Sequence, residues 1–196
     1  MKIVFATKNE NKVKEVREIL GSDFEVVSMK EAGIDIDIVE DGETFEDNAI
    51  KKAEEIMSRC NEIVIADDSG LEIDFLDGQP GVHSSRFMGE DTPYEEKNKA
   101  ILEKMKAARG SQRSARFVCA MAAAVPNKYT IIARETIEGL IAQEPAGENG
   151  FGYDPIFYVP KYKKTTAELS MEEKNKISHR GKALRVIAAR LKKISW

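Results

Sequence analysis

The sequence has few of the features that mark secreted or membrane proteins. Only two cysteines occur, Cys60 and Cys119, and both stand in apolar or helical surroundings, so we expect buried, reduced thiols. A chain of 196 residues buries enough surface to fold without a disulfide or a structural metal. No apolar run approaches the roughly 20 residues that span a membrane. The N-terminal apolar run ends after four residues, which is too short for a secretory signal. We therefore expect a cytoplasmic protein without a membrane partner.

An excess of positive charge is also missing. The formal net charge is −4 and the sequence pI is about 5.5, which argues against a nucleic-acid partner because general nucleic-acid binders are usually basic. A small phosphorylated ligand is compatible with this charge, because it needs only local positive charge and usually brings a metal ion.

Familiar catalytic and binding patterns are absent as well. The two histidines, His83 and His179, stand alone, and no cysteine or histidine lies at zinc-ligand spacing, so we expect no zinc site. Neither a GxGxxG nor a Walker A sequence occurs, which leaves a Rossmann or P-loop identity without support. A GxSxG or Ser-His-Asp pattern is missing too, so nucleophilic catalysis is not indicated.

The sequence does contain an alternation of short apolar runs with amphipathic stretches. Short apolar runs predict strands at residues 2–6, 24–29 and 62–66, and the alternation of apolar and acidic residues predicts one at 71–76. Two long runs on either side of PNK, at 115–125 and 129–142, predict a hairpin of antiparallel strands, and a further strand is predicted late in 151–160. Apolar spacing of three to four predicts helices at residues 11–20, 41–60, 94–108, 170–177 and 179–194. The expected helix caps are Asp41 or Thr44, Thr92, and the capping box of Ser170 with Glu173. This order predicts an α/β fold with a mixed sheet.

Two adjacent carboxylates follow one of the apolar runs. Ile63–Ala66 leads into Asp67 and Asp68, and the Ser69-Gly70 pair suggests a turn, so we expect the strand to end there. Neighbouring side chains on a strand point to opposite faces, so one aspartate can face a cleft while the other binds backbone or caps the turn. The end of a central strand is a common ligand position in α/β folds. The apolar run does not alternate, which leaves open which aspartate faces the cleft.

Two stretches near the N-terminus are candidates for phosphate and metal binding. Ala6–Lys12 joins a strand to a helix, and such a turn points backbone N–H groups and the positive helix end at an anion. A plain helix cap with solvated lysines is the alternative. Five carboxylates surround the start of the second helix, at Glu40, Asp41, Glu43, Glu46 and Asp47. They are either stabilised by the helix dipole or supply oxygen ligands for Mg²⁺.

Two later stretches are candidates for nucleotide recognition. Asn149–Phe157 combines glycines, aromatic residues and an aspartate, which can stack on a nucleobase and hydrogen-bond its edge. A turn before a strand, with core aromatics, is the alternative. Ile177–Leu184 places His179 and Arg180 at a predicted helix start, where Arg180 can donate to a carbonyl oxygen or a phosphate. A solvated surface pair is the alternative there.

Taken in order, six stretches resemble the inosine triphosphate pyrophosphatase family, whose members hydrolyse non-canonical purine nucleoside triphosphates. They are ATKNENKVKEV, VEDGETFEDNA, ADDSGLEID, GQPGVHSSRF, FGYDPIF and EEKNKISHRGKAL, from Ala6 to Leu184. The resemblance implies Mg²⁺-dependent hydrolysis of ITP, dITP or XTP between the α- and β-phosphates, to a monophosphate and pyrophosphate. It also implies a single domain over residues 1–196, with an elongated mixed β-sheet flanked by helices, two lobes with a central cleft, and a homodimer.

The same resemblance assigns roles to residues by motif. Asp68 is the expected general base, and Glu40 and Asp68 are the expected Mg²⁺ ligands. The expected substrate contacts are Thr7, Lys8, Asn9, Glu10, Asn11, Lys12, Ser69, Phe151, Gly152, Tyr153, Asp154, Lys174, His179 and Arg180. Lys8 stands where many relatives have a small residue, so we expect it to act through its backbone. The role of Asp67 stays open between a structural partner and a further group around the metal.

The chemistry of the bases supplies a rationale for selectivity. Donors such as Arg180 and backbone N–H groups would suit the 6-oxo group of inosine and xanthosine, and would face the 6-amino donor of adenine unfavourably. A related pyrophosphatase for pyrimidine or modified nucleotides would share the fold, but the TKNENK turn and the SHR stretch favour a purine.

Two further functions are compatible with parts of the sequence. A response-regulator receiver domain also ends a strand in paired acids, but it does so on its first strand, whereas a strand–helix unit precedes the pair here. A non-catalytic nucleotide-binding protein would use the same pocket, but the intact acids favour an enzyme.

Overall fold

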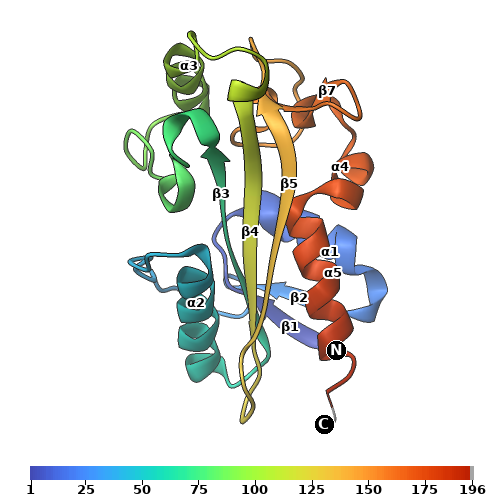
Figure 1. Cartoon of the computed structure of the whole chain (residues 1–196). Coiled ribbons are helices and arrows are strands. Elements are labelled where there is room, and N and C mark those ends of the chain that lie inside the picture. Colours follow the sequence, from blue (N-terminus) through green and yellow to red (C-terminus); the bar gives the residue numbers. More distant parts are fainter. Residues whose placement is uncertain (195–196) are drawn as a thin grey trace. The chain divides into compact units, whose positions relative to one another are not determined.

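A computed structural model describes residues 1–194 of the chain. In this range the strands form one sheet in the order β2-β1-β3-β4-β5-β6-β7 (Figure 1). The strands are β1 (Lys2–Phe5), β2 (Glu25–Ser28), β3 (Val64–Ile73), β4 (Ser114–Ala124), β5 (Ile131–Ile141), β6 (Phe157–Val159) and β7 (Lys164–Thr165). The helices are α1 (Glu10–Leu20), α2 (Phe45–Cys60), α3 (Tyr94–Lys104), α4 (Met171–Ile177) and α5 (His179–Leu191). β1 pairs in parallel with β2 and β3, whereas β6 pairs antiparallel with β5 and β7, which confirms a mixed α/β fold.

The chain divides into two compact units. Unit 1 comprises Met1–Asp68, Cys119–Glu135 and the segment from His179 onward, and unit 2 comprises Ser69–Val118 and Thr136–Ser178. The boundaries fall inside β3, β4 and β5, so each of these strands contributes residues to both units. β4 and β5 follow one another through a short turn, as the two apolar runs around Pro126 predict.

In unit 1, α1 and α5 cover one face of the strands. Their apolar residues, Val13, Val16, Leu20, Ala183, Leu184 and Ile187, share a buried cluster with Ile3, Phe5, Ile63 and Ile65. Because alternate residues of a strand point the same way, Ile65 defines the face of β3 that meets these two helices, and Ile63, just before the strand, belongs to the same cluster. Helix α2 lies on the opposite side of the strands (Figure 1).

In unit 2, the core forms around α3 and the parts of β3, β4 and β5 that belong to this unit. Ile101 of α3 packs with Leu71 and Ile73 of β3 in one buried cluster. Phe117 and Phe157 belong to the same cluster, and their ring centroids are 4.3 Å apart. Arg113 is buried there because its guanidinium donates to backbone carbonyls, among them Ile141 O at 2.6 Å and Met105 O at 2.8 Å.

The local expectations have mixed outcomes. Thr44 caps α2 by accepting from the Asp47 N–H, and Ser170 forms the predicted capping box with Glu173. The predicted Thr92 cap is wrong: α3 begins after Pro93 without a side-chain cap, because the Thr92 hydroxyl donates to Met88 O at 2.7 Å. Helix α3 also ends at Lys104, four residues before the predicted end at residue 108.

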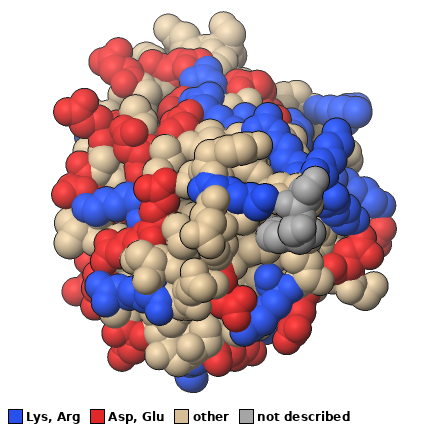
Figure 2. Space-filling view, turned by 90° about the horizontal axis from the view of Figure 1, so that it is seen from below, with Lys and Arg blue, Asp and Glu red and all other residues tan. Residues whose placement is uncertain are grey.

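The two cysteines and the surface complete the description. Neither cysteine forms a disulfide, and only Cys119 is buried, whereas Cys60 at the end of α2 is half-buried. Among residues 1–194, none of the helices is long and apolar enough to cross a membrane. On the face that Figure 2 displays, acidic and basic side chains are interspersed.

Candidate functional site

The paired aspartates lie inside a strand rather than at its end. β3 continues from Val64 through Asp67, Asp68 and Ser69 to Ile73, so the predicted strand end and turn are wrong. The prediction failed because Ser69-Gly70 is a common turn sequence, whereas here both carboxylates find partners within the fold and the strand can stay buried. Counting from Ile65, Asp67 points to the face covered by α1 and α5, and Asp68 points to the face of α2.

Asp67 is held by two cations. The Lys12 ammonium lies 3.0 Å from Oδ1, and the Arg180 guanidinium lies 3.0 Å from Oδ2 through Nη2 and 3.2 Å through Nε. Burial alone would raise the pKa of Asp67, but Lys12 and Arg180 outweigh it and hold the pKa far below its usual range. These contacts support the structural-partner interpretation of Asp67, because both of its oxygens are engaged by side chains of the helices.

Arg180 is part of the same buried group. Its Nη1 donates to Glu15 Oε2 at 2.6 Å, and both residues are almost completely buried. Burial would lower the pKa of Arg180, but Asp67 and Glu15 raise it above its ordinary value, so the guanidinium is charged. Glu15 was missed by sequence reasoning, because it follows Lys12 by one helical turn among the ordinary charges of α1. His179, at the start of α5, is also buried.

Asp68 has a different environment from Asp67. Asn48 Nδ2 donates to Asp68 Oδ2 at 2.9 Å, and Asn48 Oδ1 accepts from the Gly42 N–H at 2.8 Å. Asn48 therefore ties β3 to the segment that carries Glu40. Burial raises the pKa of Asp68, and Glu40 adds to this, although the Lys52 ammonium and the Asn48 amide act in the other direction.

Lys52 is a cation beside the predicted metal ligand Glu40. It is buried in α2 and forms an ion pair with Glu40. Burial would lower the pKa of Lys52, but the charges of Asp67, Glu40 and Asp68 outweigh it and raise the pKa. Asn48 and Lys52 are four residues apart beside the apolar stripe of α2. Two polar residues four apart lie on the same face of a helix, and on a buried face such a pair indicates a polar site. This pattern in the sequence was not recognised.

The predicted phosphate turn begins helix α1. Asn9 is the N-cap, and its side chain accepts from the Asn11 and Lys12 N–H groups, while Thr7 Oγ1 accepts from the Asn9 N–H at 3.1 Å. Glu10 is exposed in the first turn of the helix. The Lys8 ammonium reaches Asp37 at 2.8 Å and Asp35 at 3.3 Å, so its side chain contacts the extended segment that leads to Glu40.

In unit 2, Asp154 organises the Gly-rich loop. Its Oδ2 accepts from the Phe151 N–H at 2.8 Å and from the Lys174 ammonium at 2.7 Å, and its Oδ1 accepts from Thr166 Oγ1 at 2.8 Å. The Lys174 ammonium also lies 4.8 Å from the centroid of the Phe151 ring. Asp154, Lys174 and Thr166 are buried, whereas Phe151 is half-buried. Thr166 was not predicted, and no sequence pattern marked it.

The remaining predicted residues of unit 2 flank this loop. Gly152 O accepts from Asn98 Nδ2 of α3 at 3.1 Å. Tyr153 is buried and its hydroxyl donates to Ser84 O at 2.7 Å, so it supports the loop from within the core. Ser69 is half-buried on β3, directly after Asp68.

The structure thus gathers the predicted residues into two groups. In unit 1 a buried and half-buried charge group combines four carboxylates with three cations: Glu15, Glu40, Asp67, Asp68, Lys12, Lys52 and Arg180. In unit 2 a loop group joins an aromatic ring to one ion pair: Phe151, Asp154, Lys174 and Thr166. The sequence placed Arg180 in the nucleotide pocket with Phe151. In the structure the Arg180 guanidinium instead belongs to the charge group of unit 1, where it binds Asp67 and Glu15.

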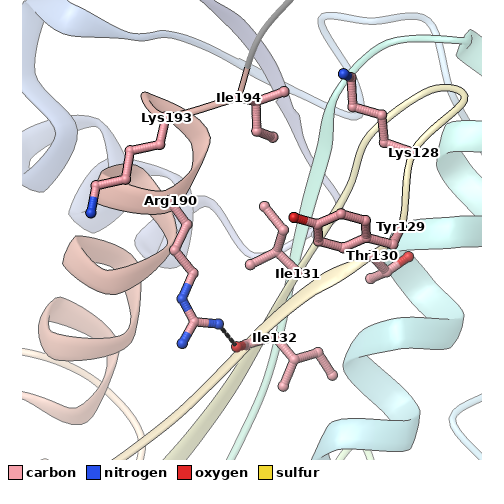
Figure 3. Close-up of a pocket in the computed structure, with 8 residues that line it drawn as sticks. All are labelled: Lys128, Tyr129, Thr130, Ile131, Ile132, Arg190, Lys193 and Ile194. Atoms are coloured by element: carbon pink, nitrogen blue, oxygen red, sulfur yellow. Dashed lines mark hydrogen bonds between the residues drawn. The ribbon is translucent and has the colours of Figure 1, made fainter.

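A pocket of about 650 Å³ also occurs in unit 1, away from the predicted residues. It lies between the turn after β4 and the C-terminal part of α5 (Figure 3). Lys128, Lys193 and Arg190 contribute positive charge to it, but the Arg190 guanidinium donates to Ile132 O at 2.7 Å. The exposed ring of Tyr129 forms part of the lining.

Comparison with known proteins identifies the family. The model of the Ham1 family matches residues 3–190. The chain belongs to the Ham1 family. A relative from Clostridium perfringens named dITP/XTP pyrophosphatase is 46% identical over 98% of each chain, and one of that name from Desulforamulus reducens is 50% identical over 94% of this chain and 92% of its own.

Solved structures of Ham1 proteins share the fold. The Ham1 protein of Coxiella burnetii has a TM-score of 0.89 at 42% identity and covers 99% of this chain and 100% of its own. The Ham1 protein of Staphylococcus aureus has a TM-score of 0.87 at 43% identity over 98% of both chains. These matches confirm the predicted family, the fold class and the prediction of an enzyme. A receiver domain is therefore excluded.

Proposed function

We propose that the chain hydrolyses non-canonical purine nucleoside triphosphates, ITP, dITP and XTP, between the α- and β-phosphates. The products are a nucleoside monophosphate and pyrophosphate. Two relatives of nearly the same length carry the name dITP/XTP pyrophosphatase, which supports the substrate class. The single observation that carries the chemistry is the contrast between two adjacent carboxylates: Asp67 is paired with Lys12 and Arg180, whereas Asp68 accepts from the neutral Asn48 amide. Their pKa values shift in opposite directions as a result.

Asp68 is the proposed general base. In the metal-free protein burial raises the pKa of Asp68, so this carboxylate holds a proton more readily than an ordinary aspartate does, and a carboxylate of this kind can take the proton of the attacking water. Asn48 fixes the carboxylate through Oδ2. Asp67 cannot share this role, since Lys12 and Arg180 keep its pKa depressed and its oxygens occupied.

Glu40 and Asp68 are the proposed holders of Mg²⁺. Among residues 1–194, no group of three or more aspartate, glutamate, histidine or cysteine side chains forms a closed metal site. Two carboxylates are nevertheless a fitting donor set, because Mg²⁺ commonly takes one or two carboxylates and completes its shell with water and substrate phosphates. When bound, the ion neutralises phosphate charge. The Lys52 ammonium beside Glu40 indicates that this position already favours a cation.

The triphosphate, with about four negative charges, requires further compensation. The start of α1 supplies the positive end of the helix dipole, and the exposed Lys8 adds side-chain charge nearby, whereas the Lys12 ammonium is already paired with Asp67. For the base, we propose that Phe151 stacks on the purine and that Lys174 and loop N–H groups favour a 6-oxo acceptor. Arg180 takes a smaller part than its sequence position suggests, because its donors already serve Asp67 and Glu15.

A panel of nucleoside triphosphates, with and without Mg²⁺, tests this proposal. We expect ITP, dITP and XTP to be hydrolysed much faster than ATP and GTP, with pyrophosphate and monophosphate identified by ³¹P NMR. Orthophosphate as the first product would refute α–β cleavage, and equal rates for all purines would refute the selectivity. Preference for a pyrimidine triphosphate would favour a related pyrophosphatase of that specificity. Binding without turnover would favour a non-catalytic role.

The assembly and the location are proposals of the same kind. We propose a homodimer, which multi-angle light scattering would detect as about twice the 21.9 kDa mass of the chain, and a monomer mass would refute it. The expected cytoplasmic location and the absence of a nucleic-acid partner stay predictions.

A further inference from the structure

The two oxygens of the Asp154 carboxylate have different partners. Oδ2 receives the Phe151 N–H and the Lys174 ammonium, at 2.8 and 2.7 Å. Oδ1 receives the Thr166 hydroxyl at 2.8 Å, and this threonine lies in a 3-10 turn, Thr166–Glu168, that is distant in sequence from the loop. A carboxylate held at both oxygens cannot rotate about its Cβ–Cγ bond without losing one set of bonds.

The loop backbone adds a second constraint on this carboxylate. Gly150 has a φ of +74°, and a Cβ at this position would lie 2.2 Å from Asp154 Oδ2. The carboxylate therefore packs directly against the main chain at Gly150. Because Oδ2 is fixed by the loop and by Lys174, the hydroxyl of Thr166 is the contact that sets the orientation of the other oxygen.

We propose that Thr166 is a positioning residue for base recognition. It acts through the Asp154 carboxylate, which accepts from the Phe151 N–H and from the Lys174 ammonium. Asp154 thereby holds the ammonium over the Phe151 ring. This inference rests on the proposed function, since it assigns Phe151 and Lys174 to the purine. Thr166 itself is 2% exposed and its hydroxyl is directed to Asp154, so it touches the loop group rather than the substrate.

Loss of the hydroxyl has a defined consequence. Oδ1 becomes a buried acceptor without this donor, and the carboxylate turns to regain a hydrogen bond. Lys174 follows the charge, and the ring of Phe151 loses its fixed neighbour. Substrate binding weakens, whereas the carboxylates proposed for hydrolysis, Glu40 and Asp68, belong to the separate charge group of unit 1. The expected signature is a change in KM with little change in kcat.

The adjacent Thr165 supplies a matched control. Both threonines are 2% exposed, and the Thr165 hydroxyl donates to Ala146 O at 2.7 Å. The Thr166 hydroxyl shares its single proton between Asp154 Oδ1 at 2.8 Å and Asp154 O at 3.1 Å. Only the Thr166 hydroxyl reaches the Asp154 carboxylate. Thr165→Val and Thr166→Val therefore remove the same chemical group from equally buried sites. The Thr165 side chain also belongs to the capping box of the turn Thr166–Glu168, so Thr165→Val measures the cost of losing a hydroxyl from this turn while the bond from Thr166 to the Asp154 carboxylate is kept.

The experiment compares the kinetics of wild type, Thr165→Val, Thr166→Val and Thr166→Ser with ITP and Mg²⁺. We expect Thr166→Val to raise KM about tenfold with kcat within about twofold, Thr165→Val to leave both near wild type, and Thr166→Ser to restore KM. Melting temperatures of all variants establish that they are folded at the assay temperature, and Thr166→Ala replaces the valine variant if that one is not.

The outcomes separate this inference from the proposed function. Wild type without ITP turnover would overturn the proposed function and the assignment that depends on it. Wild-type turnover with Thr166→Val and Thr165→Val equal in KM would overturn the role of Thr166 alone. A fall in kcat at unchanged KM would also overturn it, because the hydroxyl would then act on the chemical step.

Discussion

The two units bury an aspartate in different ways. Asp67 in unit 1 is surrounded by charge, since both its oxygens contact cations and one of those cations binds a further carboxylate. Asp154 in unit 2 meets one ammonium, one backbone N–H and one hydroxyl. In unit 1 each charge depends on several others, so the group sets an electrostatic environment. In unit 2 two neutral donors hold the carboxylate of a single ion pair in one orientation, so the group fixes the positions of Lys174 and of the loop. Substitutions in unit 1 should therefore act through charge and change kcat, stability or the Mg²⁺ requirement, whereas Thr166→Val in unit 2 should change KM.

The largest effect is expected at Asp68. Replacement by Asn removes the proposed base and should lower kcat with ITP by about 10³-fold, within the range for general bases. Because the pKa of Asp68 is raised in the folded protein, its ionised form destabilises the fold above that pKa. The neutral amide should therefore raise the melting temperature slightly in metal-free buffer at pH 7. Near-normal turnover would remove Asp68 from the mechanism.

Asp67→Asn should have the opposite effect on stability. It breaks a buried ion pair and should cost about 3 kcal/mol of unfolding free energy at pH 7. The pKa of Asp67 is depressed, so its contribution is full above the unfolded value of about 3.9 and is lost as pH falls below it. Denaturant titrations at pH 7 and pH 3 check this. Asp41→Asn, which breaks an exposed ion pair with Lys51, serves as the control for a surface pair, whose contribution is expected to be much smaller. A difference between Asp67→Asn and wild type that does not shrink at pH 3 would contradict the charge-group interpretation.

A smaller effect is expected for the proposed metal ligand. Glu40→Gln should raise the Mg²⁺ concentration for half-maximal ITP hydrolysis about tenfold, because one of two carboxylates is lost. Glu43→Gln removes the same charge three residues away from an exposed side chain and should leave the Mg²⁺ requirement unchanged. If ITP hydrolysis by the two variants depends on Mg²⁺ concentration in the same way, Glu40 is not a ligand of the metal ion.

The smallest effect concerns the contact between Lys8 and the segment before Glu40. The Asp35→Asn, Asp37→Asn double variant releases the Lys8 ammonium for phosphate and should lower KM for ITP by about twofold, since these ion pairs are solvent-exposed. Glu18→Gln with Glu25→Gln removes two charges from exposed side chains elsewhere in unit 1 and serves as control. The same fall in KM in both double variants would indicate net charge rather than the contact at Lys8.

Periodicity predicted the elements better than it predicted the site. The apolar spacing in α1 and α2 indicated helices because it repeats over several turns, and the apolar runs indicated β1, β4 and β5. The strand break at Ser69-Gly70 was wrong because turn propensity is local, whereas the partners of Asp67 and Asp68 come from α1, α2 and α5. Glu15 and Thr166 were missed for the same reason: their partners are 165 and 12 residues away in sequence.

The continuity of β3 places a limit on the length of this segment. The environments of Asp67 and Asp68 depend on their count from Ile65, since neighbouring residues face opposite sides of the sheet. One residue inserted after Ile65 would present Asp67 to Asn48 and move Asp68 beyond the reach of that amide, and Lys12 and Arg180 would meet an alanine. Loops of a family can lengthen freely, but between Ile65 and Asp68 only substitutions, and no insertions or deletions, keep both acids in place.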